Sequence, residues 1–143
     1  MQDFRNLDVW TKAHSITLEL YRLTEGFPKS EVFGLSSQIR RAASSIAANL
    51  AEGCGRTQPE FGRFLQIAFG SACELEYELL LAQDLGFLGY QPYEEINASV
   101  IEVKRMLNSL LKRIQRDVAH PTAASNVFTR PAKVLQRSGL ADS

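Results

Sequence analysis

Apolar and polar residues recur with a helical period in the segment from Gly34 to Arg56. Wound at about 100° per residue, this segment separates into two faces. The apolar face consists of Leu35, Ile39, Ala42, Ala43, Ile46 and Leu50. The polar face, at spacings of three or four residues, consists of Gly34, Gln38, Arg41, Ser45, Asn49, Glu52 and Arg56. The pattern predicts a helix that buries one side in a core and carries ordered polar groups on another.

The same period predicts three more helices, over residues 7–25, 59–85 and 93–116. The Gly-Phe-Pro run at 26–28 ends the first, because proline cannot continue a helix and disfavours helical geometry in the residue before it. Ser30 is expected to cap the second helix, whose regular part can begin a few residues later because of Gly34, and which ends near residue 52.

Residues 57–60 form a predicted boundary between the second and third helices. Thr57 and Glu60 have the spacing of a capping box, in which each side chain accepts a hydrogen bond from the other residue's backbone N–H. Pro59 fits the first turn, where its missing N–H has no intrahelical partner.

Four amphipathic helices joined by short turns predict an all-α fold, an antiparallel up-down-up-down four-helix bundle over residues 1–117. The helical period is lost after Asp117, and residues 118–143 are rich in Ala, Ser, Pro and Arg. We expect this second segment to be a flexible C-terminal tail.

The helix over residues 59–85 carries a second apolar strip about 100° from its core face, made of Phe69, Cys73, Tyr77 and Leu80. A helix in a four-helix monomer needs roughly one apolar face. The strip therefore indicates either a wide buried angle or a contact with another chain.

Composition excludes some classes of protein but does not identify a function. The 143 residues are 45% hydrophobic and 22% charged, with 16 basic and 16 acidic side chains, so any case for nucleic acid depends on where the charges lie. Cys54 and Cys73 suit reduced thiols and suggest no metal site. No signal pattern and no apolar run of about 18 residues is present. We expect a soluble cytoplasmic protein with no cofactor and no membrane association.

The polar face has two interpretations. In the first it is a structural network between the second and third helices, in which Glu74 or Glu78 receives Arg41 or Arg56. The network residues are Gln38, Ser45, Glu52, Ser71, Glu74 and Glu78. In the second interpretation arginine side chains bind phosphates, with Asn49 as an adjacent polar contact. These residues are Arg40, Arg41, Asn49, Arg56 and Arg63, with the basic end of the fourth helix as a secondary patch.

Catalytic patterns are not evident. Paired Glu-x-x-His motifs, which a di-iron bundle needs, are missing. Ser44, Ser45 and Ser71 have no base placed by a recognisable motif. We expect a protein that is not an enzyme.

One stretch resembles a known family. It reads Gln38-Ile39-Arg40-Arg41-Ala42-Ala43-Ser44-Ser45-Ile46, followed by Asn49-Leu50-Ala51-Glu52-Gly53 and Arg56. It is similar to the signature of the bacterial four helix bundle protein family, first noticed as reading frames in intervening sequences of 23S ribosomal RNA genes. The likeness extends over roughly residues 4–115.

The resemblance implies a bundle that assembles into a ring-like homopentamer. It extends to the accessory proteins of diversity-generating retroelements, which bind nucleic acid and a reverse transcriptase. We therefore expect a homo-oligomer that binds RNA or DNA through its arginines. The alternative is a protein-interaction scaffold that does not bind nucleic acid.

Overall fold

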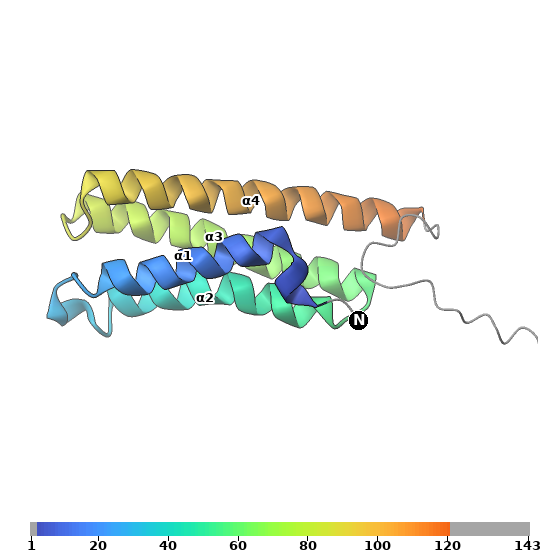
Figure 1. Ribbon diagram of the computed structural model, residues 1–143, viewed down its shortest axis with the longest axis horizontal. Coiled ribbons are helices and arrows are strands. Elements are labelled where there is room, and N and C mark those ends of the chain that lie inside the picture. The colour runs from blue at the N-terminus through green and yellow to red at the C-terminus, as the bar shows by residue number, and fades with distance from the viewer. Residues whose placement is uncertain (1–2, 121–143) are drawn as a thin grey trace, which may run out of the picture.

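The computed structural model describes residues 3–120 of the protein. Its α-helices are α1 (Asp8–Thr24), α2 (Leu35–Cys54), α3 (Gln58–Asp84) and α4 (Tyr90–Ala119). Two short 3₁₀ helices, η1 (Phe4–Asn6) and η2 (Lys29–Glu31), precede α1 and α2. The helices lie side by side and alternate in direction (Figure 1). The predicted all-α up-down-up-down bundle is confirmed, and no strand occurs between residues 3 and 120.

The start of α2 differs from the simplest expectation. Ser30 lies in η2 and does not cap the long helix, which begins at Leu35. The Leu35 N–H donates to the Glu31 carboxylate at 2.9 Å, so a side chain four residues upstream satisfies one of the unpaired N–H groups of the first turn. The regular part therefore begins after Gly34, as the glycine indicated.

The boundary between α2 and α3 has the predicted capping box. The Glu60 N–H donates to Thr57 Oγ1 at 3.4 Å, and the Thr57 N–H donates to Glu60 Oε1 at 3.3 Å. Pro59 lies in the first turn of α3. The two helices are thus joined with only three residues, 55–57, between them.

The fourth helix is longer than the predicted residues 93–116, because it begins at Tyr90 and ends at Ala119. Pro92 lies in its first turn, where a proline is tolerated since the N–H groups there lack intrahelical acceptors. At the other end the helix includes Val118 and Ala119, which were assigned to the tail. The rest of the expected tail, residues 121–143, lies outside the described residues.

The core is built around the predicted apolar face of α2, all six residues of which are buried. They pack against buried side chains of α1 and α3, among them Ile16, Leu20, Leu65 and Leu75. Near its C-terminal end α2 meets Phe61, which is 1% exposed, through Gly53. This close approach requires a residue without a side chain. Within residues 3–120, no helix combines the length and hydrophobicity needed to cross a lipid bilayer.

Replacing Gly53 with alanine is expected to destabilise the bundle. A Cβ at position 53 would lie 2.5 Å from Phe61 Cδ1 and 3.0 Å from Phe64 Cβ. Such overpacking costs about 1–3 kcal/mol, which outweighs the gain in helix propensity of up to about 1 kcal/mol. Urea unfolding would show a lower midpoint for Gly53→Ala.

Gly70→Ala is the matched control, because a Cβ at this glycine in α3 would meet no atom within 4 Å. We expect it to stabilise the protein by about 0.5–1 kcal/mol. If both alanine variants were stabilised equally, the close approach of α2 and α3 would not limit the packing.

Candidate nucleic-acid interface

The polar face of α2 meets α3 through a small hydrogen-bond network. The hydroxyl groups of Ser45 and Ser71 are 2.8 Å apart. The Asn49 amide donates to the Ser45 carbonyl oxygen at 2.8 Å and to its hydroxyl at 3.0 Å. All three side chains are half-buried. Asn49, proposed as a polar contact for a ligand, therefore belongs to the network between the helices.

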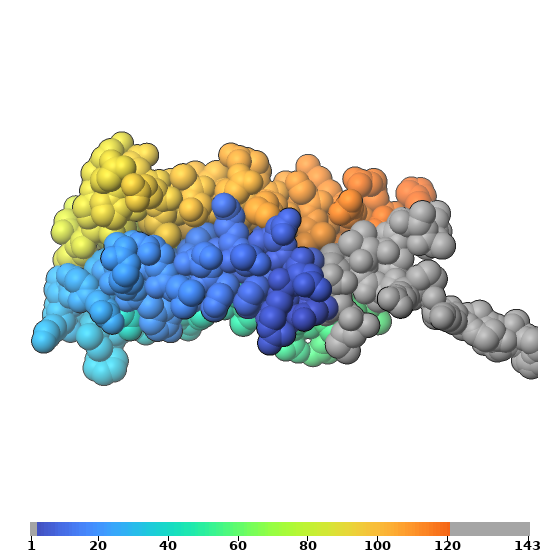
Figure 2. All heavy atoms as spheres, viewed as in Figure 1, coloured from blue at the N-terminus to red at the C-terminus, as the bar shows by residue number. Residues whose placement is uncertain are grey.

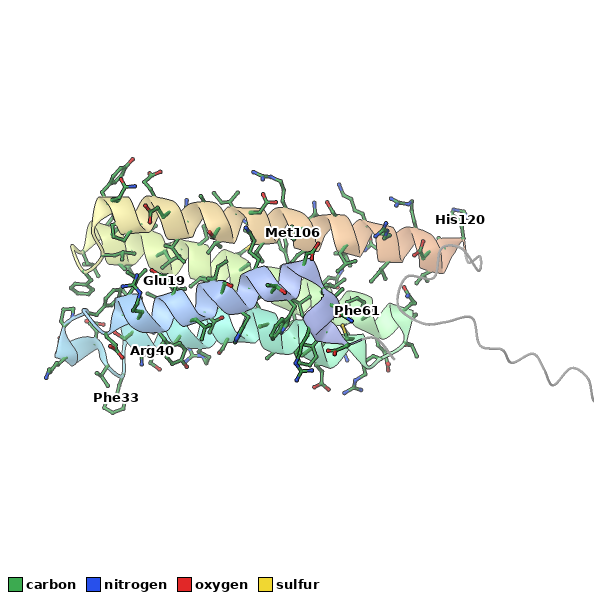
Figure 3. All side chains as sticks on the ribbon, viewed as in Figure 1. Glu19, Phe33, Arg40, Phe61, Met106 and His120 are labelled. Atoms are coloured by element: carbon green, nitrogen blue, oxygen red, sulfur yellow. The ribbon has the colours of Figure 1, made fainter. Side chains whose placement is uncertain are left out.

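Arg40 contacts α1 and does not form a cluster with the other arginines of the motif. Its Nε donates to Thr24 Oγ1 at 2.8 Å, and its Nη2 donates to the Tyr21 carbonyl oxygen at 3.0 Å. The guanidinium also lies over the Tyr21 ring, 4.5 Å from its centroid. Figure 3 places Arg40 toward the end of the bundle where α1 connects to α2. Its contacts fasten α1 to α2, which is a structural role.

Arg41 lies beside a carboxyl pair on α3. Glu78 is only 4% exposed, and its Oε1 has no hydrogen-bond partner. Burial raises the pKa of the Glu78 carboxyl to about 7, helped by the hydrogen bond and charge of Glu74, while the charge of Arg41 opposes the rise. Of the two expected partners for this pair, only Arg41 is close enough to act on it.

Arg56 does not reach Glu74 or Glu78, contrary to the expectation. It forms an ion pair with Glu52, one turn before it on α2. The physical reason is the antiparallel register: Ser45 meets Ser71, so Arg56, eleven residues after Ser45 and just past the end of α2, lies opposite the beginning of α3. Glu52, which was expected in the network, thus pairs with Arg56 one turn further along the chain.

Arg56 and Arg63 both lie beside one aromatic ring, that of Phe64. Their guanidinium carbons are 5.4 Å and 5.0 Å from the centroid of Phe64. Both arginines are exposed, as is Gln38 at the other end of α2. The ring orients two guanidinium groups whose outer N–H donors remain available for carboxylate or phosphate oxygens.

The charges of α3 and α4 are separated along the bundle. The first half of α3 and the second half of α4, which are antiparallel neighbours, form a region that we call the basic half. Its basic residues are Arg63, Arg105, Lys112, Arg113 and Arg116, against the acidic Glu60 and Asp117. Apart from Lys104 at the boundary, the remaining charges on these helices are acidic: Glu74, Glu76, Glu78, Asp84, Glu94, Glu95 and Glu102.

Two contacts support this register. Gly62 of α3 lies 3.7–3.8 Å from Ile114 and Leu111 of α4, measured from its ideal Cβ position. Lys104 donates to Glu76 at 2.6 Å where the two regions meet. The sequence pattern indicates the basic end of α4, but its alignment with Arg63 and the acidic remainder of the two helices were not among the predictions. The blocks of like charge along α4 are the signal that would have indicated them.

This arrangement gathers N–H donors of the kind that bind phosphate oxygens. Arg56 lies in the connection between α2 and α3 next to the basic half, so its guanidinium group and the cationic groups of α3 and α4 lie at one end of the bundle. Within residues 3–120, no group of three or more His, Cys, Asp or Glu side chains is placed to hold a metal ion.

Comparisons with known proteins identify relatives of unknown role. The family model of the 23S rRNA-intervening sequence protein matches residues 5–109. A crystal structure from Bacteroides thetaiotaomicron, of a protein with unknown function from the S23 ribosomal protein family, is 29% identical to the chain. The similarity covers 73% of this chain and 98% of that one, with a TM-score of 0.66. No curated protein matches the chain.

Glu78 is expected to make the stability of the bundle depend on pH. Its pKa is raised to about 7 by burial, whereas an unfolded glutamate titrates near 4.5. Below pH 4.5 both states hold the proton. As the pH rises toward 7 the unfolded state ionises first, so the stability contributed by the protonated Glu78 is lost.

The variant Glu78→Gln stays neutral and should not lose this contribution. Relative to the natural protein, its unfolding free energy should rise between pH 4.5 and 7 and stay higher by on the order of 1–3 kcal/mol at pH 8. Urea unfolding at pH 5 and pH 8 measures this difference, with the exposed Glu25→Gln as control. If the stability of Glu78→Gln and that of Glu25→Gln depended on pH to the same extent, burial would not raise the pKa of the Glu78 carboxyl.

Proposed function

Because the chain belongs to the 23S rRNA-intervening sequence protein family, we propose that it is a non-enzymatic bundle that binds RNA or DNA. The observation that carries this proposal is the separation of charge, which collects cations at one end of a chain with no net charge. Phosphate contacts supply most of the affinity in sequence-independent binding.

The separation of charge also orients the nucleic acid. At physiological ionic strength, interactions between exposed charges fade over about 8 Å. The acidic residues of the other half therefore do not cancel the attraction of the basic half, but they repel a phosphate backbone that approaches them. We infer that the nucleic acid lies across the basic half and avoids the end of the bundle that contains Asp84 and Glu94.

Five side chains make the proposed phosphate contacts. They are Arg56, Arg63, Lys112, Arg113 and Arg116. Arg40 is bound to Thr24 and Tyr21, and Arg41 lies beside the Glu74–Glu78 pair. Arg56 also has a partner, Glu52, but both side chains of that ion pair are exposed, so Arg56 is the motif arginine that we include in the proposed contact surface.

Arg63→Gln tests the contact surface. Arg63 is exposed and contacts Phe64, so its loss should leave folding intact while removing one phosphate contact. Its RNA affinity in 100 mM salt should fall by roughly 3- to 10-fold, and the slope of log K against log salt should become shallower by about one. A gel-shift or filter-binding series from 50 to 300 mM salt measures both.

Arg22→Gln is the matched control, because Arg22 is exposed on α1 in an ion pair with Glu19, a bond that contributes little to stability. Its affinity and salt slope should not change. An equal loss in both variants, or binding by the natural protein that does not depend on salt, would remove the proposal.

A second observation favours self-association. Of the apolar strip on α3, Tyr77 is 61% exposed and Leu80 42% exposed. Cys73 is exposed as well, and only Phe69 is half-buried, beneath the Lys104 ammonium. The strip is therefore not part of a second buried face of α3 within one chain. We propose that it contacts another chain, in a homo-oligomer or, in the scaffold alternative, on a protein partner.

The double substitution Tyr77→Ser with Leu80→Ser should weaken that contact. Light scattering at micromolar concentration should give the natural protein a multiple of 16.0 kDa, and the family resemblance predicts five copies. The double variant should be more monomeric, because it has less apolar surface to bury between chains and burial of that surface stabilises the contact.

Leu85→Ser with Tyr90→Ser is the control, since these residues are 54% and 64% exposed and lie off the strip. A monomeric natural protein would contradict self-association. A natural protein that is monomeric alone but retains a second polypeptide through Tyr77 at high salt would favour the scaffold.

A further inference from the structure

A groove separates α1 from α4 on the face shown in Figure 2. It has a volume of about 900 Å³. Ile16 of α1 and Ile96 of α4 are buried beneath it, with the half-buried Leu23 and Met106 beside them. Figure 3 places Glu19 and Met106 at the two sides of this space. The groove thus has an apolar floor between two helices.

The rim of the groove is acidic. Its acidic residues are Asp8, Glu19, Glu95 and Glu102, and its basic residues are Lys12 and Arg22. Arg22 is already paired with Glu19, and Glu102 is paired with Arg105, which lines the adjoining hollow nearer the end of α4. Glu95 accepts only from the neutral Gln91 amide among the polar contacts of the described chain. An occupant with positive charge and apolar side chains would complement this surface.

The groove continues toward the end of α4. A second hollow of about 720 Å³ shares Asp8, Glu102 and Met106 with the first and extends to Arg116. Arg116 lies one turn before His120, after which the undescribed residues begin. A segment that follows position 120 therefore starts at one end of a continuous depression between α1 and α4.

The amino-acid composition of residues 121–143 is complementary to the groove, since it combines apolar and basic residues. Two apolar pairs, Val127-Phe128 and Val134-Leu135, are seven residues apart. The charges nearby are Arg130, Lys133 and Arg137, and the single acidic residue of the segment is Asp142. Residues 3–120 carry 15 acidic and 13 basic side chains. The zero net charge of the whole chain thus results from an acidic body and a basic C-terminal segment.

We propose that residues 127–137 of the same chain occupy the groove between α1 and α4. In this arrangement Val134-Leu135 covers the floor near Ile96, Val127-Phe128 covers it near Met106, and the basic side chains face the acidic rim. The reach is sufficient: from Ala119 back to Ile96 is about 35 Å along a helix at 1.5 Å per residue. Thirteen extended residues from His120 to Lys133 span up to about 43 Å.

Covalent attachment makes weak contacts sufficient. A tethered segment meets its site at an effective concentration in the millimolar range, so a few partly screened ion pairs and a small apolar contact hold it in place. A second copy of the chain has no such advantage at micromolar concentration, which is why we assign the groove to the chain's own segment.

Zero-length cross-linking of the full chain tests the proposal. A carbodiimide joins a lysine to a carboxylate only when the two are in contact, and Lys133 is the only lysine after residue 120. We expect peptides that link Lys133 to Asp8, Glu19, Glu95 or Glu102. Glu25 and Asp84, exposed carboxylates away from the groove, should give at least fivefold less product.

A 1:1 mixture of ¹⁵N-labelled and unlabelled protein identifies the source of the segment. Links within one chain give only fully light or fully heavy peptide pairs, as we expect. Mixed pairs would assign the groove to a second copy and overturn the proposal. Equal linking of Lys133 to Glu25 and to Glu95 would overturn it as well, because the segment would then have no preferred place.

Trypsin cleavage after Lys133 and Arg137 supplies an independent readout, since the bond after Arg130 precedes Pro131 and resists trypsin. In Glu95→Gln, which removes one rim charge from an exposed position, cleavage should be about 2- to 5-fold faster at low salt, the range expected for one surface ion pair. The control Glu25→Gln should be cleaved at the rate of the natural protein. Equal rates in all three proteins would contradict occupation of the groove.

Discussion

The close packing of α2 against α3 is the constraint on which the rest of the structure depends. Gly53 allows the Phe61 ring to lie directly against the α2 backbone, and the capping box at Thr57 reverses the chain within three residues. Small residues at Ala42 and Ala43 leave room for both neighbouring helices. Once this pair is formed, α1 and α4 complete a core whose buried apolar area supplies most of the stability.

The antiparallel register converts a sequence pattern into a surface. The acidic second half of α3 pairs with the acidic first half of α4, and the basic ends of both helices meet at the other end. The same register keeps Arg56 beside Arg63 and far from Glu78. Charges that cancel over the chain are therefore unequal at each end, and the proposed attraction for phosphates follows from that inequality.

The polar face of α2 divides between structural and exposed groups. Ser45 and Asn49 satisfy each other and Ser71 across the helix pair, which removes the cost of burying them. Glu78 is held differently, as a buried carboxyl whose pKa rises because its charged form is poorly solvated. Arg40 joins α2 to α1 through Thr24. Most polar residues of the motif that indicates the family thus make contacts that hold the helices together.

The order and period of the helices and the boundary between α2 and α3 could be determined from the sequence, because they depend on local properties. Periodicity placed Ile39 and Leu50 in the core, and the spacing of Thr57 and Glu60 located a cap. The partners of long polar side chains could not be determined in this way, since Arg40, Arg41 and Arg56 have similar sequence environments but different neighbours. Only the tertiary structure decided that Arg40 binds α1, that Arg56 lies opposite the start of α3, and that α1 stands away from α4 to leave a groove. Those outcomes depend on which residues of different helices lie at the same level along the bundle axis. Packing of the whole bundle sets that register.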